Sequence, residues 1–386
     1  MDLSILSANL RRVRTSRGLS QVAVAEQAEL SREGYRRIED GQVEPRVDSL
    51  SRIASVLKVS LNELLVPVRE LRAVRFRAHK RMTTREDLLA NVARWLDDYV
   101  YLENLLHKNL DHKLTELSTG LSGSKRVAPE DAAARARELM GLKPDESIRD
   151  ICGLFEAHGI KVFTPSLASD GFFGLSIGAA DGGPAIVVNR WERISVERWM
   201  FTAAHELGHL LLHLDAYNVD KINEDDDEEK EADIFAAHFL MPEQMFKKEH
   251  AEAAGLSWYD RIFKLKRLFR VSYRTVLYRI ASALPPAQRK NVWIRFNVEY
   301  KRHNGGRSLP SIEEPLALSS DAFGLRPAEK RADEPEHLDR HDFMQDRLAR
   351  LVRLAVQQDE ITIGKAAEIL ELDLSEMREL VNSWME

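Results

Sequence analysis

Two histidines and a glutamate near the middle of the chain have the types and spacing of a metal-dependent hydrolytic site. His205 and His209 stand four residues apart, and Glu206 directly follows the first histidine. On an α-helix, residues four apart lie about 40° from each other around the axis and about 6 Å apart along it. Both imidazoles could therefore hold one small cation from one face of a helix, with Glu206 beside a water molecule on that cation.

Hydrolysis of a peptide bond is the chemistry that this arrangement predicts. A zinc ion lowers the pKa of a water molecule that it binds, and Glu206 can accept the proton as the oxygen attacks a carbonyl. The same carboxylate could then pass the proton to the leaving amine. Zinc is the default ion for such ligands, with Mn2+ as the alternative. The alternative interpretation of His205 and His209 is a pair of hydrogen-bonded core histidines.

A catalytic zinc site needs a third protein ligand. His213 belongs to the same predicted helix, but it lies about 12 Å along the axis from His205, whereas the ion must lie between His205 and His209. We therefore exclude His213 as the third ligand. It remains, with Tyr217 and His238, a candidate for the group that stabilises the oxyanion.

An acidic run at residues 220–233 offers better candidates for the third ligand. It holds nine carboxylates and two lysines, and its second half begins a predicted helix. We expect Glu229 to bind the metal and Asp233, four residues on, to accept the free N–H of a ligand histidine. Glu228 and Glu231 are the remaining candidate ligands. The alternative interpretation of the run is a solvated loop and helix start.

The elements that would hold these residues form a mixed α/β domain, which we place at residues 130–284. Short apolar runs bounded by turn residues predict strands at 161–163, 171–177 and 185–189. Helical periodicity predicts helices at 148–158, 195–214, 228–240 and 260–283. Strand 185–189 could pair with an extended substrate at the edge of the sheet or could be fully buried, and the sequence fits both.

Residues 1–66 predict an all-α domain of short helices that are separated by glycine and proline turns. The second helix is expected to begin at Ser20 and the third at Ser31, because serine is a favoured N-cap. Two further helices are expected at 47–57 and 61–65.

Residues 67–129 join this domain to the next one. The stretch 67–86 carries a local charge of +5 and is expected to be a basic linker. A long amphipathic helix is predicted at 85–117 and a linker at 118–129. Apolar residues form a heptad-like seam along the helix at Leu88, Val92, Trp95, Tyr99, Leu102 and Leu106. The seam could be the contact of a homodimer or could pack the helix on its own chain.

Residues 285–386 are predicted to be mainly α-helical. A polar, proline-containing stretch at 302–337 is expected to be poorly ordered, and helices are expected at 340–357 and 362–384. Residues 361–380 could form a second helix-turn-helix or a helical pair that docks on the preceding domain.

Composition and charge exclude several classes of protein. A length of 386 residues suggests two or three domains. The formal net charge of −6 means that any DNA-binding surface must be local. A single cysteine, Cys152, excludes a disulfide scaffold and a cysteine-rich zinc module. No apolar run reaches the ~20 residues of a membrane helix and no signal pattern is present, so we expect a cytoplasmic protein with no membrane partner.

The peptidase-like region resembles the ImmA/IrrE family of metallopeptidases. The resemblance is carried by residues 183–189, 201–213, 229–237 and 240–242. It implies an α+β zincin-like fold with a gluzincin-like site, in which His205 and His209 bind the metal, Glu206 is the general base and Glu229 is the third ligand. It also implies a repressor protein as the substrate. Asp233 stands where the family often has Asn.

The N-terminal region resembles the XRE (Cro/C1-type) helix-turn-helix family. The resemblance is carried by Gly18-Leu19-Ser20-Gln21, Leu30-Ser31 and Arg37-Ile38-Glu39-Asp40-Gly41. It implies that the third helix enters the major groove of double-stranded DNA. Gln21 would contact phosphate, Arg32, Glu33 and Arg36 would face base edges, and Arg37 would lie on the same surface. The alternative is that this domain, whose net charge is only +1, docks another protein.

These patterns together predict a multi-domain, DNA-binding transcriptional regulator that carries a zinc-dependent metallo-endopeptidase. The expected partners are an operator and a protein substrate, which would be a repressor, an antitoxin or the chain itself. One alternative is a transcription factor whose peptidase-like domain senses a ligand or a metal without proteolysis. Another is a component of a toxin–antitoxin or phage-defence system.

Overall fold

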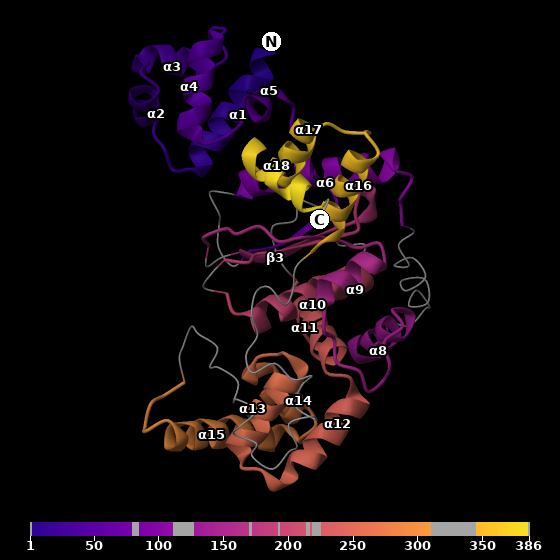
Figure 1. Cartoon of the computed structure of the whole chain (residues 1–386). Coiled ribbons are helices and arrows are strands. Elements are labelled where there is room, and N and C mark those ends of the chain that lie inside the picture. Colours follow the sequence, from indigo (N-terminus) through magenta and orange to yellow (C-terminus); the bar gives the residue numbers. More distant parts are fainter. Residues whose placement is uncertain are drawn as a thin grey trace. The chain divides into compact units, whose positions relative to one another are not determined.

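The computed structural model (Figure 1) describes residues 2–78, 85–110, 127–169, 172–191, 194–213, 217, 225–309 and 345–384, with residues 76–78 described by their backbone alone. The chain forms two compact units. One comprises Met1–Leu71 and Ala78–Leu102, and the other comprises Arg72–Arg77 and Glu103–Glu386. Residues 72–77 therefore belong to the second unit, although the chain on either side of them belongs to the first.

The first unit contains the predicted domain of short helices. They are α1 (Leu3–Ser16), α2 (Gln21–Gln27), α3 (Arg32–Glu39), α4 (Val47–Leu57) and α5 (Leu61–Leu65). Both predicted serine caps are confirmed. The hydroxyl of Ser20 accepts the N–H of Ala23 at 3.0 Å, and that of Ser31 accepts the N–H of Gly34 at 3.0 Å. Each serine thereby satisfies a backbone donor that the helix leaves unpaired.

A buried carboxylate, Glu39, connects three of these helices. It accepts two hydrogen bonds from Arg14, at 2.6 and 2.9 Å, one from the Gln21 amide at 2.8 Å and one from the Tyr35 hydroxyl at 2.8 Å. Burial raises the pKa of Glu39, but these hydrogen bonds outweigh burial and hold the pKa below its ordinary value. The ionised carboxylate therefore ties α1 and α2 to α3 by charge-assisted hydrogen bonds.

The long helix that follows, α6 (Arg85–Leu105), is shorter than predicted. The prediction that it extends to residue 117 is wrong, because His107 adopts a left-handed backbone (φ 52°), which cannot continue a helix. All six residues of the predicted seam are buried within the single chain. Their burial favours packing of α6 on its own chain over a homodimer contact.

A four-stranded sheet lies in the described part of the second unit. Its strands are β1 (Val74–Ala78), β2 (Lys161–Phe163), β3 (Phe172–Ile177) and β4 (Ala185–Val188), in the order β1-β3-β4-β2. β2 is parallel to β4, and β3 is antiparallel to β4. The three strands predicted for this domain are confirmed. β4 is buried between β2 and β3, so the interpretation of residues 185–189 as an edge strand is wrong.

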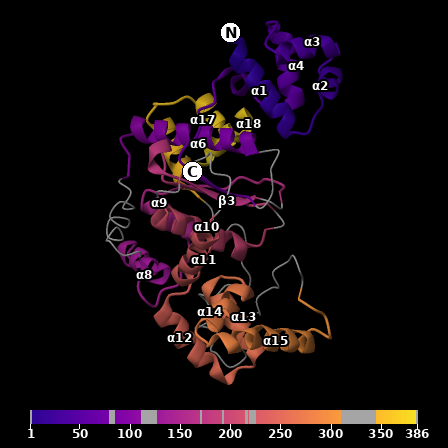
Figure 2. The same ribbon diagram turned by 180° about the vertical axis from the view of Figure 1, so that it is seen from behind.

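Helix α10 (Val196–Leu212) packs on β3 and β4, and α11 (Asp226–Leu240) packs on α10 and on α8 (Pro129–Leu139) (Figures 1 and 2). The other helices of this unit are α9 (Ile151–Ala157), α12 (Glu243–Glu252), α13 (Trp258–Phe269), α14 (Tyr273–Ser282), α15 (Pro286–His303), α16 (Arg347–Gln357), α17 (Ile363–Leu370) and α18 (Leu374–Ser383), with 3-10 turns η1 (Ala179–Asp181) and η3 (Ala253–Gly255). One apolar core extends from α8 to Tyr300 of α15.

Two predicted helices are each split in the structure, and α8, α12 and α15 lie outside the predicted helix ranges. The predicted helix 260–283 divides into α13 and α14 at Arg270, and the predicted helix 362–384 divides into α17 and α18 at Glu371. Both residues have φ 55°, so each ends its helix in the left-handed conformation. Most of the stretch 302–337, predicted to be poorly ordered, lies outside the described residues.

Buried polar contacts tie the C-terminal helices to the sheet domain. The carboxylate of Glu156 accepts the backbone N–H groups of Asp346 and Arg347, at the start of α16. The guanidinium of Arg347 pairs with Glu103 at 2.5 Å, and Glu103 also pairs with Lys161 of β2 at 3.0 Å. The start of α16 is thus docked, and α17 packs on α16. No helix in the described part of the chain is long and apolar enough to cross a membrane.

Small residues let α10 and α11 approach each other closely. A Cβ atom on Gly208 of α10 would lie 3.0 Å from the Phe235 ring and 3.3 Å from the Cα of Ala232 on α11. Ala232 and Ala236 of α11 are themselves fully buried. This contact sets the distance between the helix that carries the two histidines and the helix that carries the predicted third ligand.

We expect Gly208→Val to lower the free energy of unfolding by about 1–3 kcal/mol, because the branched side chain would overlap Phe235 and the α11 backbone. Gly255→Val is the control, since a Cβ atom there would meet nothing within 4 Å. Urea unfolding of the full chain measures both. Equal midpoints for the two variants would mean that the two helices do not depend on this close contact.

Candidate functional site

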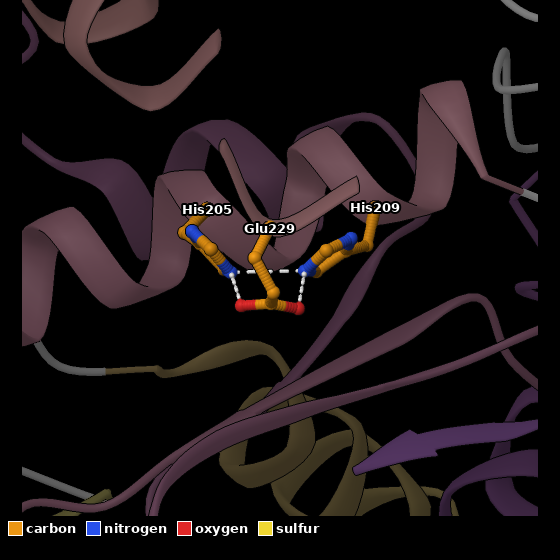
Figure 3. A group of neighbouring side chains, drawn as sticks. All are labelled: His205, His209 and Glu229. Atoms are coloured by element: carbon orange, nitrogen blue, oxygen red, sulfur yellow. Dashed lines mark hydrogen bonds and ion pairs between the residues drawn. The ribbon is translucent and has the colours of Figure 1, made fainter. Parts of the chain in front are cut away.

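The structure brings His205, His209 and Glu229 together between α10 and α11 (Figure 3). One ligand atom from each residue lies within 4.8 Å of the other two. The Nε2 atoms of the two histidines are 2.9 Å apart, and they lie 3.3 and 3.1 Å from the two carboxylate oxygens of Glu229. Both imidazoles are almost fully buried, with exposed fractions of 0% and 1%. The three side chains therefore converge on one point away from bulk water.

The hydrogen-bond partner of each Nδ1 atom, on the far side of the ring, determines which ring nitrogen carries the hydrogen. His205 Nδ1 lies 2.8 Å from the carboxylate of Asp233, which can only accept, so Nδ1 carries the hydrogen. His213 Nε2 likewise donates to Glu231 at 3.0 Å, which leaves its Nδ1 to accept from His209 Nδ1 at 2.9 Å. Both Nε2 atoms are then lone-pair acceptors.

This assignment places two imidazole lone pairs and a carboxylate in mutual contact. Three acceptor groups at such distances repel each other unless a cation lies among them. Two histidines and one glutamate are the ligands of a common class of catalytic zinc site, which keeps a fourth position open for water or substrate. The donor set of His205, His209 and Glu229 therefore fits a zinc ion.

The pKa values of these groups favour metal binding. Burial lowers the pKa of His209 well below its ordinary value, although a contact with Glu229 acts in the opposite direction. Burial also lowers the pKa of His213. The ion pair with Arg75, at 3.1 Å, favours the ionised form of the Glu229 carboxylate. Neutral imidazoles and an ionised carboxylate are the forms that bind a metal.

The other acidic candidates occupy supporting positions. Asp233 lies where the sequence places it, as the acceptor for His205. Glu231 pairs with His213, and Glu228 pairs with Arg75, so neither belongs to the His-His-Glu group. The supporting role of His213 was missed by the sequence analysis. Its signal was present, because a residue four positions beyond His209 stacks on the same helix face.

Glu206 is fully buried and lies against β3. The hydroxyl of Ser176 donates to its Oε2 atom at 2.8 Å, and the hydroxyl of Tyr217 donates to Ser176 Oγ at 2.8 Å. A Cβ atom on Gly174 of β3 would lie 3.1 Å from Glu206 Oε1, so a glycine there leaves room for the carboxylate. Two residues outside the sequence motif, Ser176 and Tyr217, thus fix the orientation of Glu206.

The three candidate oxyanion groups lie in different surroundings. His213 belongs to the hydrogen-bond chain behind His209, and Tyr217 donates to Ser176. His238 lies 2.7 Å from a guanidinium nitrogen of Arg279, away from the His-His-Glu group. Tyr217 is the candidate that the structure connects to Glu206.

Arg75 is a residue of the site that the sequence analysis missed. It projects from β1 and forms ion pairs with Glu228 and, at 3.1 Å, with Glu229. Residues 74–78 alternate apolar and basic types, which is the period-two pattern of a half-buried strand. The high positive charge of residues 67–86 favoured a linker instead of a strand. The linker prediction is wrong for residues 74–78, which form β1.

The predicted DNA-contacting residues lie on or beside α3. Arg32, Glu33 and Arg37 are exposed. Arg36 pairs with Glu33 at 2.6 Å and with Asp40 at 3.0 Å, and the Gln21 amide donates inward to Glu39. Within the described part of the chain, Arg32 and Arg37 have no ion-pair partner, so their guanidinium groups are open to a ligand.

We expect Asp233→Ala to weaken zinc binding about 10- to 100-fold, because His205 loses the acceptor that fixes its tautomer and orientation. Asp227→Ala is the matched control, since Asp227 lies on the same helix and pairs only with the exposed Lys230 among described residues. Competition with a chromogenic chelator measures both affinities. Equal affinities for the two variants would contradict the role of Asp233.

Comparisons with known proteins agree with this geometry. Residues 10–64 match a family model described as helix-turn-helix, and residues 155–281 match the model of the M78 peptidase family, described as IrrE N-terminal-like domain. A search of curated proteins found no match. Both resemblances predicted from the sequence are confirmed, in the same order along the chain. The chain therefore joins a helix-turn-helix domain to an IrrE N-terminal-like peptidase domain, as a DNA-binding regulator with a metallopeptidase-type domain.

Proposed function

We propose that this protein is a zinc-dependent endopeptidase that its helix-turn-helix domain brings to an operator, where it cleaves a protein regulator of transcription. The regulator would be a repressor, an antitoxin or a second copy of this chain. The observation that carries the proposal is the convergence of His205, His209 and Glu229 at 2.9–3.3 Å, with Glu206 on the same helix.

His205, His209 and Glu229 would hold the zinc ion. When bound, zinc would supply Lewis acidity that polarises the peptide carbonyl and makes the attacking water more acidic. Glu206 would accept the proton of that water and deliver it to the leaving nitrogen, so that the peptide bond breaks as a carboxylic acid and an amine form. Asp233 and His213 would keep the two imidazoles in the required tautomer.

Ser176 and Tyr217 would orient the general base. Burial raises the pKa of Tyr217, although the hydrogen bond to Ser176 acts in the opposite direction, so the tyrosine keeps its proton and remains a donor. The hydroxyl of Ser176 then points at Glu206. A domain that only senses a metal would need no such base, because Glu206 is not one of the three grouped ligands.

We expect Glu206→Gln to lower the rate of peptide cleavage about 10²- to 10⁴-fold while zinc content stays unchanged, because the amide cannot accept the proton. The probe is a library of proteome-derived peptides, with products identified by mass spectrometry. Glu252→Gln, at an exposed position of α12, is the control. Equal product patterns for wild type and Glu206→Gln would argue against the peptidase, as would the absence of products from the zinc-loaded wild type.

The exposed face of α3 is the proposed DNA contact. Arg32 and Arg37 project guanidinium groups that suit phosphate or the major-groove edge of guanine. Glu33 could accept from cytosine, but its ion pair with Arg36 must then open, and Gln21 would reach phosphate beside its contact with Glu39.

We expect Arg32→Ala to weaken binding to DNA about 10- to 100-fold, because an exposed guanidinium at the start of α3 is lost. The probe is a duplex that the wild-type protein selects from a random library, and fluorescence anisotropy gives the affinity. Arg289→Ala, on the exposed surface of α15, removes the same charge from another domain. Equal affinities for the two variants would remove α3 from the DNA contact.

A further inference from the structure

The edge of the sheet beside the general base is occupied by β1. The strand order is β1-β3-β4-β2, and β3 carries both Ser176, which donates to Glu206, and Gly174, which makes room for it. A peptidase of this class would bind an extended substrate by pairing it with the strand next to the general base. Here the backbone N–H and C=O groups of β3 that face this edge pair with β1 of the same chain.

Three backbone hydrogen bonds anchor the start of β1. The N–H groups of Arg72 and Ala73 both donate to the Asp181 carboxylate at 2.6 Å. The Ala73 carbonyl accepts the N–H of Gly178 at 2.8 Å. Gly178 directly follows the last residue of β3, and Ala73 directly precedes the first residue of β1. β1 can therefore pair with β3 only by running antiparallel to it.

The side chain of Arg75 occupies the acidic end of α11. It is 11% exposed and pairs with both Glu228 and Glu229. Burial lowers the pKa of Arg75, but the hydrogen bonds that it donates to the two glutamates outweigh burial and raise it. β1 therefore combines main-chain pairing with one buried basic side chain next to the predicted ligand Glu229, as a bound peptide would.

Edge position makes β1 removable. An edge strand pairs on one side only, so its departure leaves the pairing of β3, β4 and β2 intact. The residues directly before and after 72–77 belong to the other compact unit. Contacts, and not the adjacent sequence, therefore hold this segment in the sheet domain.

We propose that β1 is a displaceable occupant of the substrate-pairing edge, and that an extended peptide with an arginine takes its place when it leaves. The Arg75 position gives the preference for a basic side chain, because Glu228 and Glu229 would otherwise lose their partner. This inference rests on the proposed function, since it treats the edge of β3 that β1 covers as the substrate edge.

The test is binding of a fluorescein-labelled peptide with the sequence of residues 74–78, VRFRA, to metal-free full-length protein. This peptide lacks Arg72 and Ala73, so its own binding does not use Asp181. If β1 competes with the peptide, the apparent affinity is the intrinsic affinity multiplied by the fraction of molecules in which the edge is open. A variant that releases β1 should therefore bind the peptide more tightly. We expect Asp181→Ala and Arg75→Ala to bind the peptide at least tenfold more tightly than the wild type. Asp48→Ala, which removes an exposed carboxylate of α4, is the control and should match the wild type.

Hydrogen exchange on the same proteins gives a second readout. The amides of residues 74–78 should exchange faster in Asp181→Ala and Arg75→Ala, whereas those of 185–188 in β4 should keep their protection and report that the domain is folded. A peptide in which the arginine at the Arg75 position is replaced by glutamate should bind at least tenfold more weakly to Arg75→Ala.

Equal affinities for wild type, Asp181→Ala and Arg75→Ala, or no binding to any of them, would overturn the proposal and make β1 a permanent strand. Neither readout needs zinc or cleavage. Peptide binding that follows the prediction in a protein without peptidase activity would therefore refute the proposed function alone, and cleavage without competition by β1 would refute this inference alone.

Discussion

The burial of two imidazoles and a carboxylate between α10 and α11 is the constraint on which the second unit depends. Buried polar groups are costly unless each has a partner. The outward nitrogens of His205 and His209 are satisfied by Asp233 and His213, and this leaves the inward nitrogens facing Glu229 as acceptors. The close contact at Gly208 makes this arrangement possible, and a cation would remove the remaining repulsion between the acceptors.

Much of the site follows from helical periodicity alone. Spacing of four residues predicts that His205 and His209 share a helix face, excludes His213 as a ligand, and selects Glu229 with Asp233 on the next helix. The strands of the sheet domain and the serine caps of α2 and α3 also follow from local patterns. These features depend on residues near each other in the sequence, and for that reason the sequence predicts them.

The features that were missed depend on long-range contacts or on single backbone angles. β1 is anchored by Asp181, more than a hundred residues away, which accepts the N–H groups of Arg72 and Ala73 just before the strand. The alternating pattern of residues 74–78 is local, but it does not identify this partner. The helix breaks at Arg270 and Glu371 come from residues in the left-handed conformation that are not glycine, so the residue types at these positions do not predict a break. Ser176 and Tyr217 reach Glu206 only once β3 lies against α10.

The metal content of the full-length protein, measured by native and elemental mass spectrometry, tests most directly whether His205, His209 and Glu229 bind zinc. We expect one zinc ion per chain in the wild type and none in His205→Ala. Zinc content should be unchanged in His250→Ala, which removes a partly buried histidine of α12. A wild-type protein that takes up no metal, or a His205→Ala variant that keeps its zinc, would contradict the assignment of these residues as a metal site.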